Sequence, residues 1–283
     1  MASRKKNAFR LLIAIFAITM ATAAQSSNEH FKLADAAFDA HNYVLAVAEY
    51  TKGLQIDPND EAANYNRGLA NYHTGNYAAV ITDLTKVLQI DPQNVDAFYR
   101  RGRAYYLRLP ALNDLVQEKA TLDAAIADYT RAIQIKADHA DAYRSRGQVY
   151  YVQGSYDRAM FDYSKAIQID PDFLSDYYNR GLVYKEKQNF DAAIADFTKA
   201  IKLDSGYLDA YLDRGRAYYN KGAYDLAIAD YTQVIRAKER SATAYLDRAN
   251  AYCKAGKNPL AKADYERAVQ LQPAFSISPR LCK

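Results

Sequence analysis

The chain repeats itself every 34 residues, and no other feature restricts its fold as strongly. The tripeptide Ile-Asp-Pro ends at Pro58, Pro92 and Pro171, and the first two prolines are 34 residues apart. Three further steps of 34 lead from Pro171 to Pro273, whereas the step from Pro92 to Ala137 is 45, which is 34 plus an insertion of 11. Seven repeats therefore fill residues 27 to 275, at 27–60, 61–94, 95–139, 140–173, 174–207, 208–241 and 242–275. Such a period indicates a repeat architecture, in which each repeat buries its apolar face against its neighbours.

Two columns of glycine divide each repeat into two helices. One column, Gly75, Gly154, Gly222 and Gly256, stands in phrases such as Thr-Gly-Asn-Tyr and predicts the turn between the helices. Apolar side chains recur at helical spacing before and after that turn, so the repeats are expected to be all-α. The other column lies inside the first helix, where glycine costs about 1 kcal/mol relative to alanine, and it predicts backbones packed too closely for a side chain. Its members are Gly68, Gly102, Gly147, Gly181 and Gly215.

The repeats resemble tetratricopeptide repeats. The family's pattern of an aromatic residue, Leu-Gly, Tyr, Ala, Phe and Pro on a 34-residue period is met in the fourth repeat by Tyr143, Gly147, Tyr150, Ala159, Tyr163 and Pro171. Tyr or Phe replaces the usual Trp, and Arg replaces the Leu before the glycine. The resemblance implies a right-handed α-solenoid of seven antiparallel helix pairs, whose concave surface holds a peptide or protein and which is not an enzyme.

An arginine column and an aspartate column flank the turn at equal distances. Arg146 lies eight residues before Gly154 and Asp162 eight residues after it, which places the two side chains abreast in the helix pair. We expect six Arg–carboxylate pairs with bidentate hydrogen bonds. Arginines that grip phosphate groups are the weaker interpretation, because the opposing carboxylates would repel the same anion. The pairs are Arg67–Asp83, Arg101–Asp128, Arg146–Asp162, Arg180–Asp196, Arg214–Asp230 and Arg248–Asp264.

A second face of the first helices is the candidate partner-binding groove. If the aromatic, glycine and tyrosine columns pack inside, the residue after each of them points elsewhere, and in the tetratricopeptide family that direction is the concave groove. Tyrosine, leucine and scattered cations there would form a stacking surface for an extended ligand. The alternative is that the tyrosines only fill half-exposed helix positions. We call these residues the groove rows: Tyr65, Leu69 and Tyr72; Tyr99, Arg103 and Tyr106; Arg144, Gln148 and Tyr151; Tyr178, Leu182 and Lys185; Leu212, Arg216 and Tyr219.

The N-terminus has the pattern of an export signal. Basic residues precede an apolar stretch of 14 residues, Leu11 to Ala24, which ends in small residues and falls short of the roughly 20 needed to cross a bilayer. We expect residues 1–24 to be removed, leaving a periplasmic or secreted protein without a stable membrane span. The net charge of +4 comes entirely from four basic residues among the first ten, and the neutral remainder argues against a nucleic-acid partner.

Two further segments stand out. The insertion at 109–119 nearly completes three helical turns, so the second helix of the third repeat could begin early, near Pro110, and place Leu112, Leu115, Val116 and Leu122 on one side. That side is a candidate second contact site, or an insertion that packs on its neighbour. The tail, 276–283, holds one of only two cysteines, and an exported location allows Cys253 and Cys282 to form a disulfide, although their geometry is not set by the sequence.

Chemical motifs are scarce. The four histidines and two cysteines lack metal-ligand spacing, and no phosphate loop or nucleophile motif occurs, so we expect neither cofactor nor metal. The expected function is that of a non-catalytic scaffold that binds a peptide or protein in the bacterial cell envelope. The alternative is a carbohydrate-associated module in polysaccharide export or envelope biogenesis, since tyrosine faces also stack on sugars.

Overall fold

The computed structural model describes residues 25–109, 114–277 and 282, and their regular elements are all helices. The chain divides into two compact units, Met1–Asp138 and His139–Lys283. Within the described residues there are fourteen α-helices, which form the seven pairs that the repeat predicts. The expected export signal at 1–24 lies outside the described residues.

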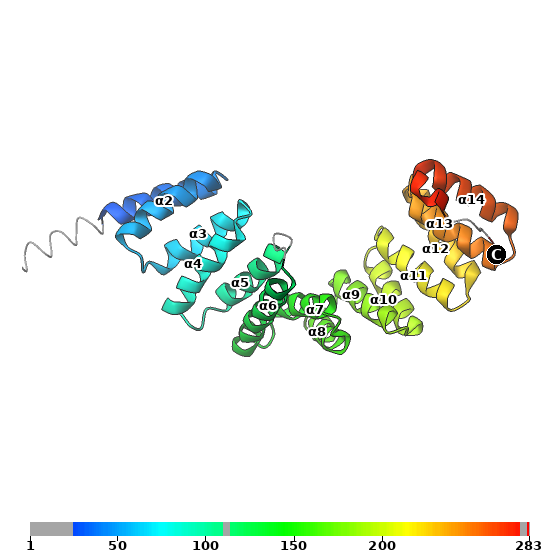
Figure 1. The fold of residues 1–283 in the computed structure, drawn as a ribbon. Helices are drawn as coiled ribbons and strands as arrows, with labels where there is room; N and C mark the ends of the chain where they lie inside the picture. The colour runs from blue at the N-terminus through cyan, green and yellow to red at the C-terminus, as the bar shows by residue number, and fades with distance from the viewer. Residues whose placement is uncertain (1–24, 110–113, 278–281, 283) are drawn as a thin grey trace, which may run out of the picture. The chain divides into compact units, whose positions relative to one another are not determined.

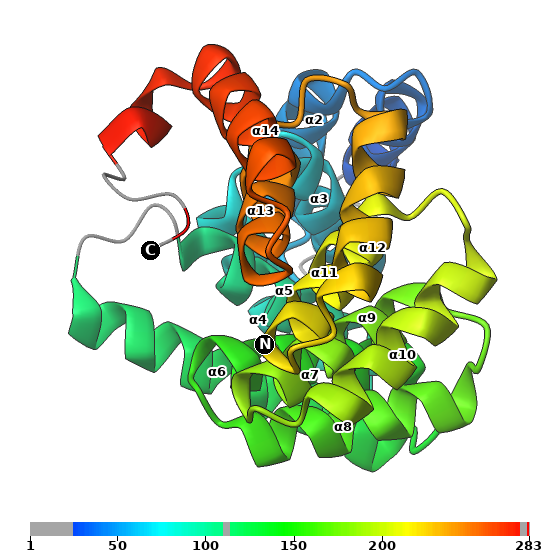
Figure 2. The same ribbon diagram turned by 90° about the vertical axis from the view of Figure 1, so that its right-hand side faces the viewer.

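Unit 1 contains the first three repeats (Figure 1, Figure 2). From α2 to α6, each helix packs against the next one along the chain, so contacts within a helix pair alternate with contacts between pairs. The elements are the helical residues 25–39, α2 (Tyr43–Ile56), α3 (Glu61–His73), α4 (Tyr77–Ile90), α5 (Val95–Arg108) and α6 (Leu115–Ile135).

Unit 2 contains the last four repeats and has the same consecutive packing. A short 3₁₀ helix follows the last pair and contacts α14. The elements are α7 (Ala140–Val152), α8 (Tyr156–Ile169), α9 (Leu174–Glu186), α10 (Phe190–Leu203), α11 (Leu208–Asn220), α12 (Tyr224–Ala237), α13 (Ala242–Lys254), α14 (Asn258–Leu271) and η2 (Pro273–Ile277).

The turns inside the pairs use the left-handed backbone conformation that glycine favours. Gly75 has φ +76°, and the following Asn76 caps α4 by accepting a hydrogen bond from the N–H of Ala79 at 3.3 Å. The other three turn glycines have φ between +70° and +78°. His41 and Gln188 hold the same turn position in the first and fifth repeats, with φ +58° and +59°, so these two turns carry the strain of a side chain at positive φ.

The glycine column inside the first helices permits close contact with the second helix of the same pair. A Cβ atom at Gly215 would lie 2.6 Å from the ring of Tyr231, and one at Gly102 would lie 2.8 Å from the ring of Tyr129. Gly68 differs from this expectation, because its partner is Leu84 rather than an aromatic ring. The nearest atom to a Cβ at Gly68 would lie 3.4 Å away, which is ordinary contact, so the second repeat has room for a methyl group.

The insertion lengthens the second helix of the third repeat. Helix α6 has 21 residues, whereas the second helices of the other described repeats from α2 onward have 14. Leu122 is buried, but Leu115 and Val116 at the new N-terminal end are 81% and 76% exposed. Pro110 and Leu112 lie outside the described residues. The helix starts early, as expected, but at Leu115 rather than near Pro110, and its apolar first turn faces solvent.

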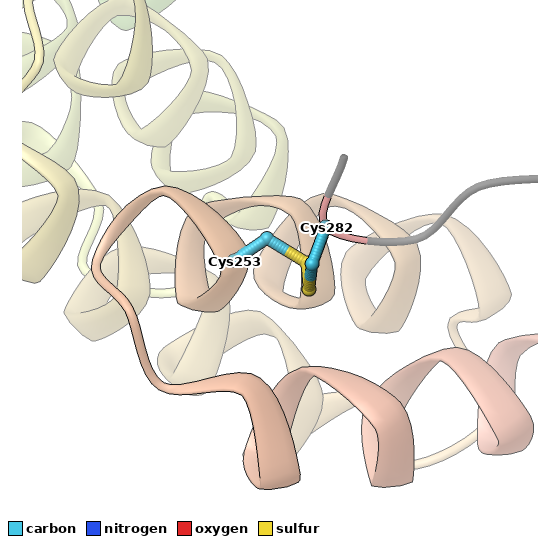
Figure 3. The surroundings of a disulfide bond; sticks show 2 residues. All are labelled: Cys253 and Cys282. Carbon is cyan, nitrogen blue, oxygen red and sulfur yellow. A yellow bond between two sulfur atoms is a disulfide. The ribbon is translucent and has the colours of Figure 1, made fainter.

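The C-terminal end is joined to the last repeat by a covalent bond. Cys253 of α13 forms a disulfide with Cys282, and the two Cα atoms are 4.9 Å apart (Figure 3). The other tail residues from 278 onward lie outside the described residues. None of the described helices is both long enough and apolar enough to cross a bilayer.

Candidate binding groove

A repeated ion pair joins the two helices in six of the seven helix pairs. All six Arg–Asp pairs are present, with shortest N–O distances between 2.6 and 2.8 Å. In the fourth repeat Arg146 donates from Nε and Nη2 to the two carboxylate oxygens of Asp162, each at 2.8 Å. Burial raises the pKa of the Asp162 carboxyl, and the hydrogen bonds and charge of Arg146 oppose that rise. Each of these arginines is therefore engaged by its aspartate and is not an exposed group that could bind an anion.

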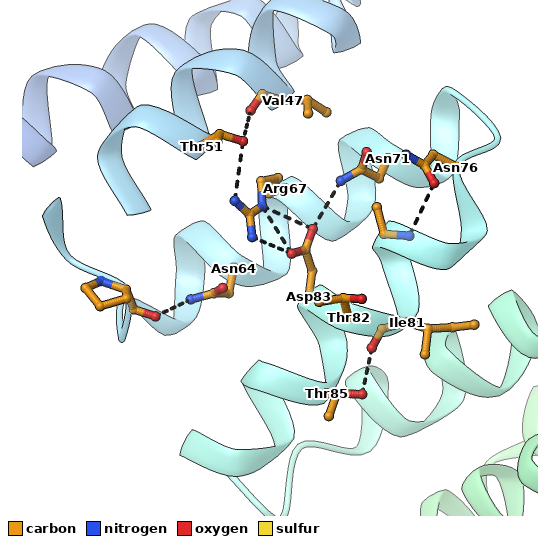
Figure 4. A network of polar contacts seen from close by, with 12 residues as sticks. Val47, Thr51, Asn64, Arg67, Asn71, Asn76, Ile81, Thr82, Asp83 and Thr85 are labelled. Carbon is orange, nitrogen blue, oxygen red and sulfur yellow. Dashed lines mark hydrogen bonds and ion pairs between the residues drawn. The ribbon is translucent and has the colours of Figure 1, made fainter. Parts of the chain in front are cut away.

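The same arginines also reach the preceding repeat. Arg67 donates from Nη1 to the hydroxyl of Thr51 at 3.3 Å, and Thr51 donates to the carbonyl of Val47 at 2.7 Å (Figure 4). Asn71 adds a hydrogen bond to Asp83 at 3.1 Å. Arg67 thus joins three helices: α2, α3 and α4.

This inter-repeat contact recurs, and it is not among the contacts predicted from the sequence. In each case a threonine or serine stands 16 residues before the arginine. In the repeats without the insertion, the paired aspartate stands 16 residues after the arginine. A search for polar columns 16 residues apart would have found it. The further arginine–hydroxyl contacts, at 2.9 to 3.0 Å, are Arg101–Thr85, Arg180–Ser164, Arg214–Thr198 and Arg248–Thr232.

The groove rows lie along the first helices α3, α5, α7, α9 and α11. Their side chains are half-buried, except for the exposed Gln148. Three of the row tyrosines have their rings set by an aromatic residue at the start of the second helix of the same pair. The ring centroids are 5.8 Å apart for Tyr72–Tyr77, 5.9 Å for Tyr151–Tyr156 and 5.5 Å for Tyr219–Tyr224. These rings are held in place while part of their surface stays accessible.

The row cations of unit 2 do not act as free charges. Each is paired with a carboxylate that the first helix of the next repeat supplies. In two of the three pairs, burial raises the pKa of that carboxyl and the cation opposes the rise. The pairs are Arg144–Asp176 at 3.0 Å, Lys185–Asp213 at 2.9 Å and Arg216–Asp247 at 2.9 Å.

The rows of unit 1 are arranged around tyrosine. The guanidinium of Arg103 lies over the rings of Tyr72 and Tyr99, 5.4 and 5.9 Å from their centroids. The hydroxyl of Tyr65 donates to the carboxylate of Asp96 in the next repeat. Burial, followed by this hydrogen bond, raises the pKa of Tyr65 to about 12, so its hydroxyl remains a donor at neutral pH.

Each unit has a hollow on its groove rows. The unit 2 hollow has a volume of about 740 Å³ and is lined by Lys185, Glu186, Gln188, Phe190, Arg216, Tyr219, Asn220, Tyr231, Asp247 and Asn250. The unit 1 hollow has about 620 Å³ and is lined by Asp60, Glu61, Ala62, Tyr65, Asn66, Asn94 and Asp96. The first mixes rings, amides and balanced charges, whereas three carboxylates dominate the second. Among the described residues, no group of three or more His, Cys, Asp or Glu is placed to hold a metal ion.

The sequence rule for the groove rows also applies to the last repeat, to which it was not extended. The residues after Tyr245, Ala249 and Tyr252 are Leu246, Asn250 and Cys253. Asn250 lines the unit 2 hollow, so the row of α13 takes part in the groove. Counting seven repeats and applying the rule to each would have included it.

Models of tetratricopeptide repeats match most of the chain. Two models described as tetratricopeptide repeat match residues 31–95 and 178–242, and residues 242–275, respectively. A third, described as TPR repeat, matches residues 121–154 and 147–188. No curated protein sequence matches the chain.

Solved structures with the same fold cover much of the chain. The crystal structure of MamA is 28% identical with a TM-score of 0.57, and the match covers 64% of this chain and 93% of MamA. The C-terminal part of a TPR repeat-containing protein from Cytophaga hutchinsonii is 21% identical with a TM-score of 0.71, covering 86% and 95%. YrrB, described as a TPR protein with an unusual peptide-binding site, is 20% identical with a TM-score of 0.56, covering 67% and 92%.

Proposed function

Because this chain belongs to the tetratricopeptide repeat family, we propose that it is a non-catalytic scaffold that binds an extended peptide or a protein partner along its groove rows. The observation that carries the proposal is the set of row tyrosines whose rings are held by a second aromatic residue, one of which, Tyr219, lines the open unit 2 hollow. A ring that is already fixed loses little conformational entropy on binding and still offers a large contact area and a hydroxyl.

The two hollows suggest what parts of a partner would suit each unit. In unit 1, the carboxylates of Asp60 and Glu61 favour a basic side chain near Tyr65, whereas Asp96 is already paired with Arg100. In unit 2, the cations Lys185 and Arg216 are already paired with carboxylates, so the hollow favours uncharged polar and aromatic groups. YrrB, which has the same fold, has a peptide-binding site and supports the idea that such helix pairs bind peptides.

The proposed location is the bacterial cell envelope, with residues 1–24 acting as the export signal. The apolar stretch Leu11 to Ala24 after a basic start supports export. The disulfide between Cys253 and Cys282 also supports it, because disulfides persist in oxidising compartments outside the cytosol. Detection of the mature protein in a periplasmic or secreted fraction, with an N-terminus near Gln25, tests this proposal.

The binding proposal is tested by photo-crosslinking from the groove. A benzophenone amino acid replaces Tyr219 in one variant and Phe161 in the control, because Phe161 is 56% exposed on α8 and is not a groove-row residue. In envelope extract, the Tyr219 variant is expected to form a discrete crosslinked product that the Phe161 variant does not form. Equal products from both positions would contradict a role for the groove.

Substitution of the row tyrosines provides the complementary test. The double variant Tyr106→Ala and Tyr151→Ala should lose the partner identified by crosslinking, while its helical circular dichroism stays that of the parent. The control Phe161→Ala should keep the partner. Full retention by the double variant would show that the tyrosines only fill half-exposed positions.

A carbohydrate-associated role is the second candidate. The unit 2 hollow brings the rings of Phe190 and Tyr219 together with the side-chain amides of Asn220 and Asn250, which suits a neutral sugar chain as well as a peptide. A glycan array probed with the mature protein distinguishes the two roles. Binding of a glycan that is lost in Tyr219→Ala would favour this candidate over a peptide partner.

A further inference from the structure

One repeat with an Arg–Asp pair lacks the aromatic residue that stands three residues before the arginine in the others. In the third to seventh repeats, the ring centroid of that residue lies 5.4 to 5.9 Å from the guanidinium carbon of the arginine. In the second repeat Asn64 holds this position before Arg67, so the second repeat is one ring short beside its arginine. The rings of the other repeats belong to Phe98, Tyr143, Tyr177, Tyr211 and Tyr245.

A hollow with a volume of about 300 Å³ lies beside Arg67, and Pro58, Asn64 and Lys86 also line it. None of the described residues that line it belongs to the groove rows. The side-chain amide of Asn64 donates to the backbone carbonyl of Pro58 at 3.1 Å (Figure 4) and to that of Asp60 at 2.7 Å. The short side chain of Asn64 is thus turned toward the loop before α3 and leaves the space next to Arg67 open.

The fifth repeat shows what fills the equivalent space. The ring centroid of Tyr177 lies 5.9 Å from the guanidinium carbon of Arg180 and 5.5 Å from the ammonium nitrogen of Lys199. Its hydroxyl donates to the backbone carbonyl of Pro171 at 3.1 Å. The hollow therefore has the surroundings that hold an aromatic ring in the fifth repeat. The residues of the second repeat at the positions of these three contacts all line the hollow: Arg67, Lys86 and Pro58.

We propose that this hollow is a second binding site, separate from the groove rows, and that it takes the phenol ring of a tyrosine side chain presented by a protein partner. The ring would lie over the guanidinium of Arg67 and beside the ammonium group of Lys86, both of which attract its negative face. The pairing of Arg67 with Asp83 does not prevent this contact. Arg180 is paired with Asp196 by the same two hydrogen bonds and still contacts a ring.

The surroundings of the hollow also explain why a tyrosine carried by a polypeptide suits it. The rings at the equivalent position of the other repeats are only half-buried, so a ring bound here would keep one edge at the surface, where a backbone can carry it. The carbonyl of Pro58 has two lone pairs and can accept from a phenol hydroxyl as well as from Asn64. The site would therefore read one exposed tyrosine of a partner.

Nuclear magnetic resonance of the mature protein tests the proposal with two probes. One probe is p-cresol, the isolated side chain of tyrosine, and the other is the blocked tripeptide acetyl-Gly-Tyr-Gly-amide. The reporters are the Nε–H groups of Arg67 and Arg180, each held by the carboxylate of its own pair. Two variants exchange the sites: Asn64→Tyr fills the hollow with a ring of its own, and Tyr177→Asn opens an equivalent hollow beside Arg180.

In the parent protein, both probes should shift the Nε–H signal of Arg67 and leave that of Arg180 unchanged. The shift at Arg67 should be lost in Asn64→Tyr, and Tyr177→Asn should gain a shift at Arg180. No shift at Arg67 in the parent protein, or a shift that persists in Asn64→Tyr, would overturn the proposal. A shift with p-cresol but not with the tripeptide would overturn the assignment to a protein partner, because the site would then take only a free ring.

The filling variant has a second form in case Asn64→Tyr does not fold. Asn64→Phe places at this position the residue that Phe98 provides in the third repeat, and it should abolish the shift at Arg67 in the same way. Circular dichroism shows which of the two variants keeps the helical content of the parent protein. Because the hollow lies outside the groove rows, any result here leaves the crosslinking test from Tyr219 unaffected.

Discussion

The loss of Asp162 should destabilise unit 2 far more than the loss of another aspartate on the same helix. Asp162 is 1% exposed and receives two hydrogen bonds from Arg146, whose side chain is 12% exposed. Asp157, five residues earlier on α8, forms an ion pair with Lys187 but is 81% exposed. Asp162→Ala and Asp157→Ala therefore remove the same group from two very different environments.

The expected costs follow from what each substitution leaves behind. Asp162→Ala leaves the guanidinium of Arg146 buried without its carboxylate, 5.6 and 5.9 Å from the ring centroids of Tyr143 and Tyr150. Breaking a buried pair in this way costs about 3 to 5 kcal/mol, and the aromatic faces offset only part of it. An exposed pair contributes about 0 to 1 kcal/mol, so Asp157→Ala should be nearly neutral.

Urea denaturation followed by circular dichroism measures both costs, and hydrogen exchange of α7 and α8 shows where the stability is lost. A third variant, Arg146→Met with Asp162→Leu, removes both charges and should recover most of the loss, because no buried charge then lacks its partner. Equal destabilisation by Asp162→Ala and Asp157→Ala would refute the reasoning. Failure of the double variant to recover would show that the pair itself, and not the stranded charge, determines the stability.

Three further predictions concern packing, turn geometry and the contact between repeats. Gly215→Ala should lower the urea midpoint of unfolding, because its Cβ would lie 2.6 Å from a buried tyrosine ring and overpacking costs about 1 to 3 kcal/mol. Gly68→Ala should raise that midpoint, because there is room for the methyl group and alanine favours the helix. Midpoints that move in the same direction would contradict this prediction. Gln188→Gly should stabilise the protein by about 1 kcal/mol in urea, since φ is +59° there, and a loss of stability would be inconsistent with strain at that turn. Thr232→Val removes the hydroxyl that accepts a hydrogen bond from Arg248 of the next repeat at 2.9 Å. The substitution should lower the free energy of unfolding by about 1 to 2 kcal/mol and speed hydrogen exchange in α13. Unchanged exchange in α13 would argue against an inter-repeat role of this hydroxyl.

The fold and the ladder of Arg–Asp pairs could be predicted because both follow one fixed spacing. The pairs form at a separation of 16 residues, as in Arg146–Asp162, and at 27 in Arg101–Asp128, where the insertion adds 11. Two positions that lie equally far from a turn face each other in every antiparallel helix pair. The positions of the arginine and aspartate columns in the sequence are therefore enough to predict which side chains are in contact.

The partners of the groove cations could not be predicted in that way. They come from the next repeat at separations that vary: 32 residues for Arg144–Asp176, 28 for Lys185–Asp213 and 31 for Arg216–Asp247. No single column holds these carboxylates, so the repeat pattern does not reveal them. Their pairing depends on how one first helix lies against the next, which the packing of whole helix pairs determines.

This difference has a consequence for recognition. An anionic ligand that drew Arg216 away from Asp247 would leave the Asp247 carboxylate without its partner, and burial already disfavours the charged form of that carboxyl. An uncharged ligand meets no such cost, because the amides of Asn220 and Asn250 and the ring of Tyr219 remain available beside the intact pair. If the proposed binding function holds, the charge balance of the unit 2 hollow should therefore disfavour acidic segments, even though two cations line it, and favour a neutral, hydrogen-bonding segment.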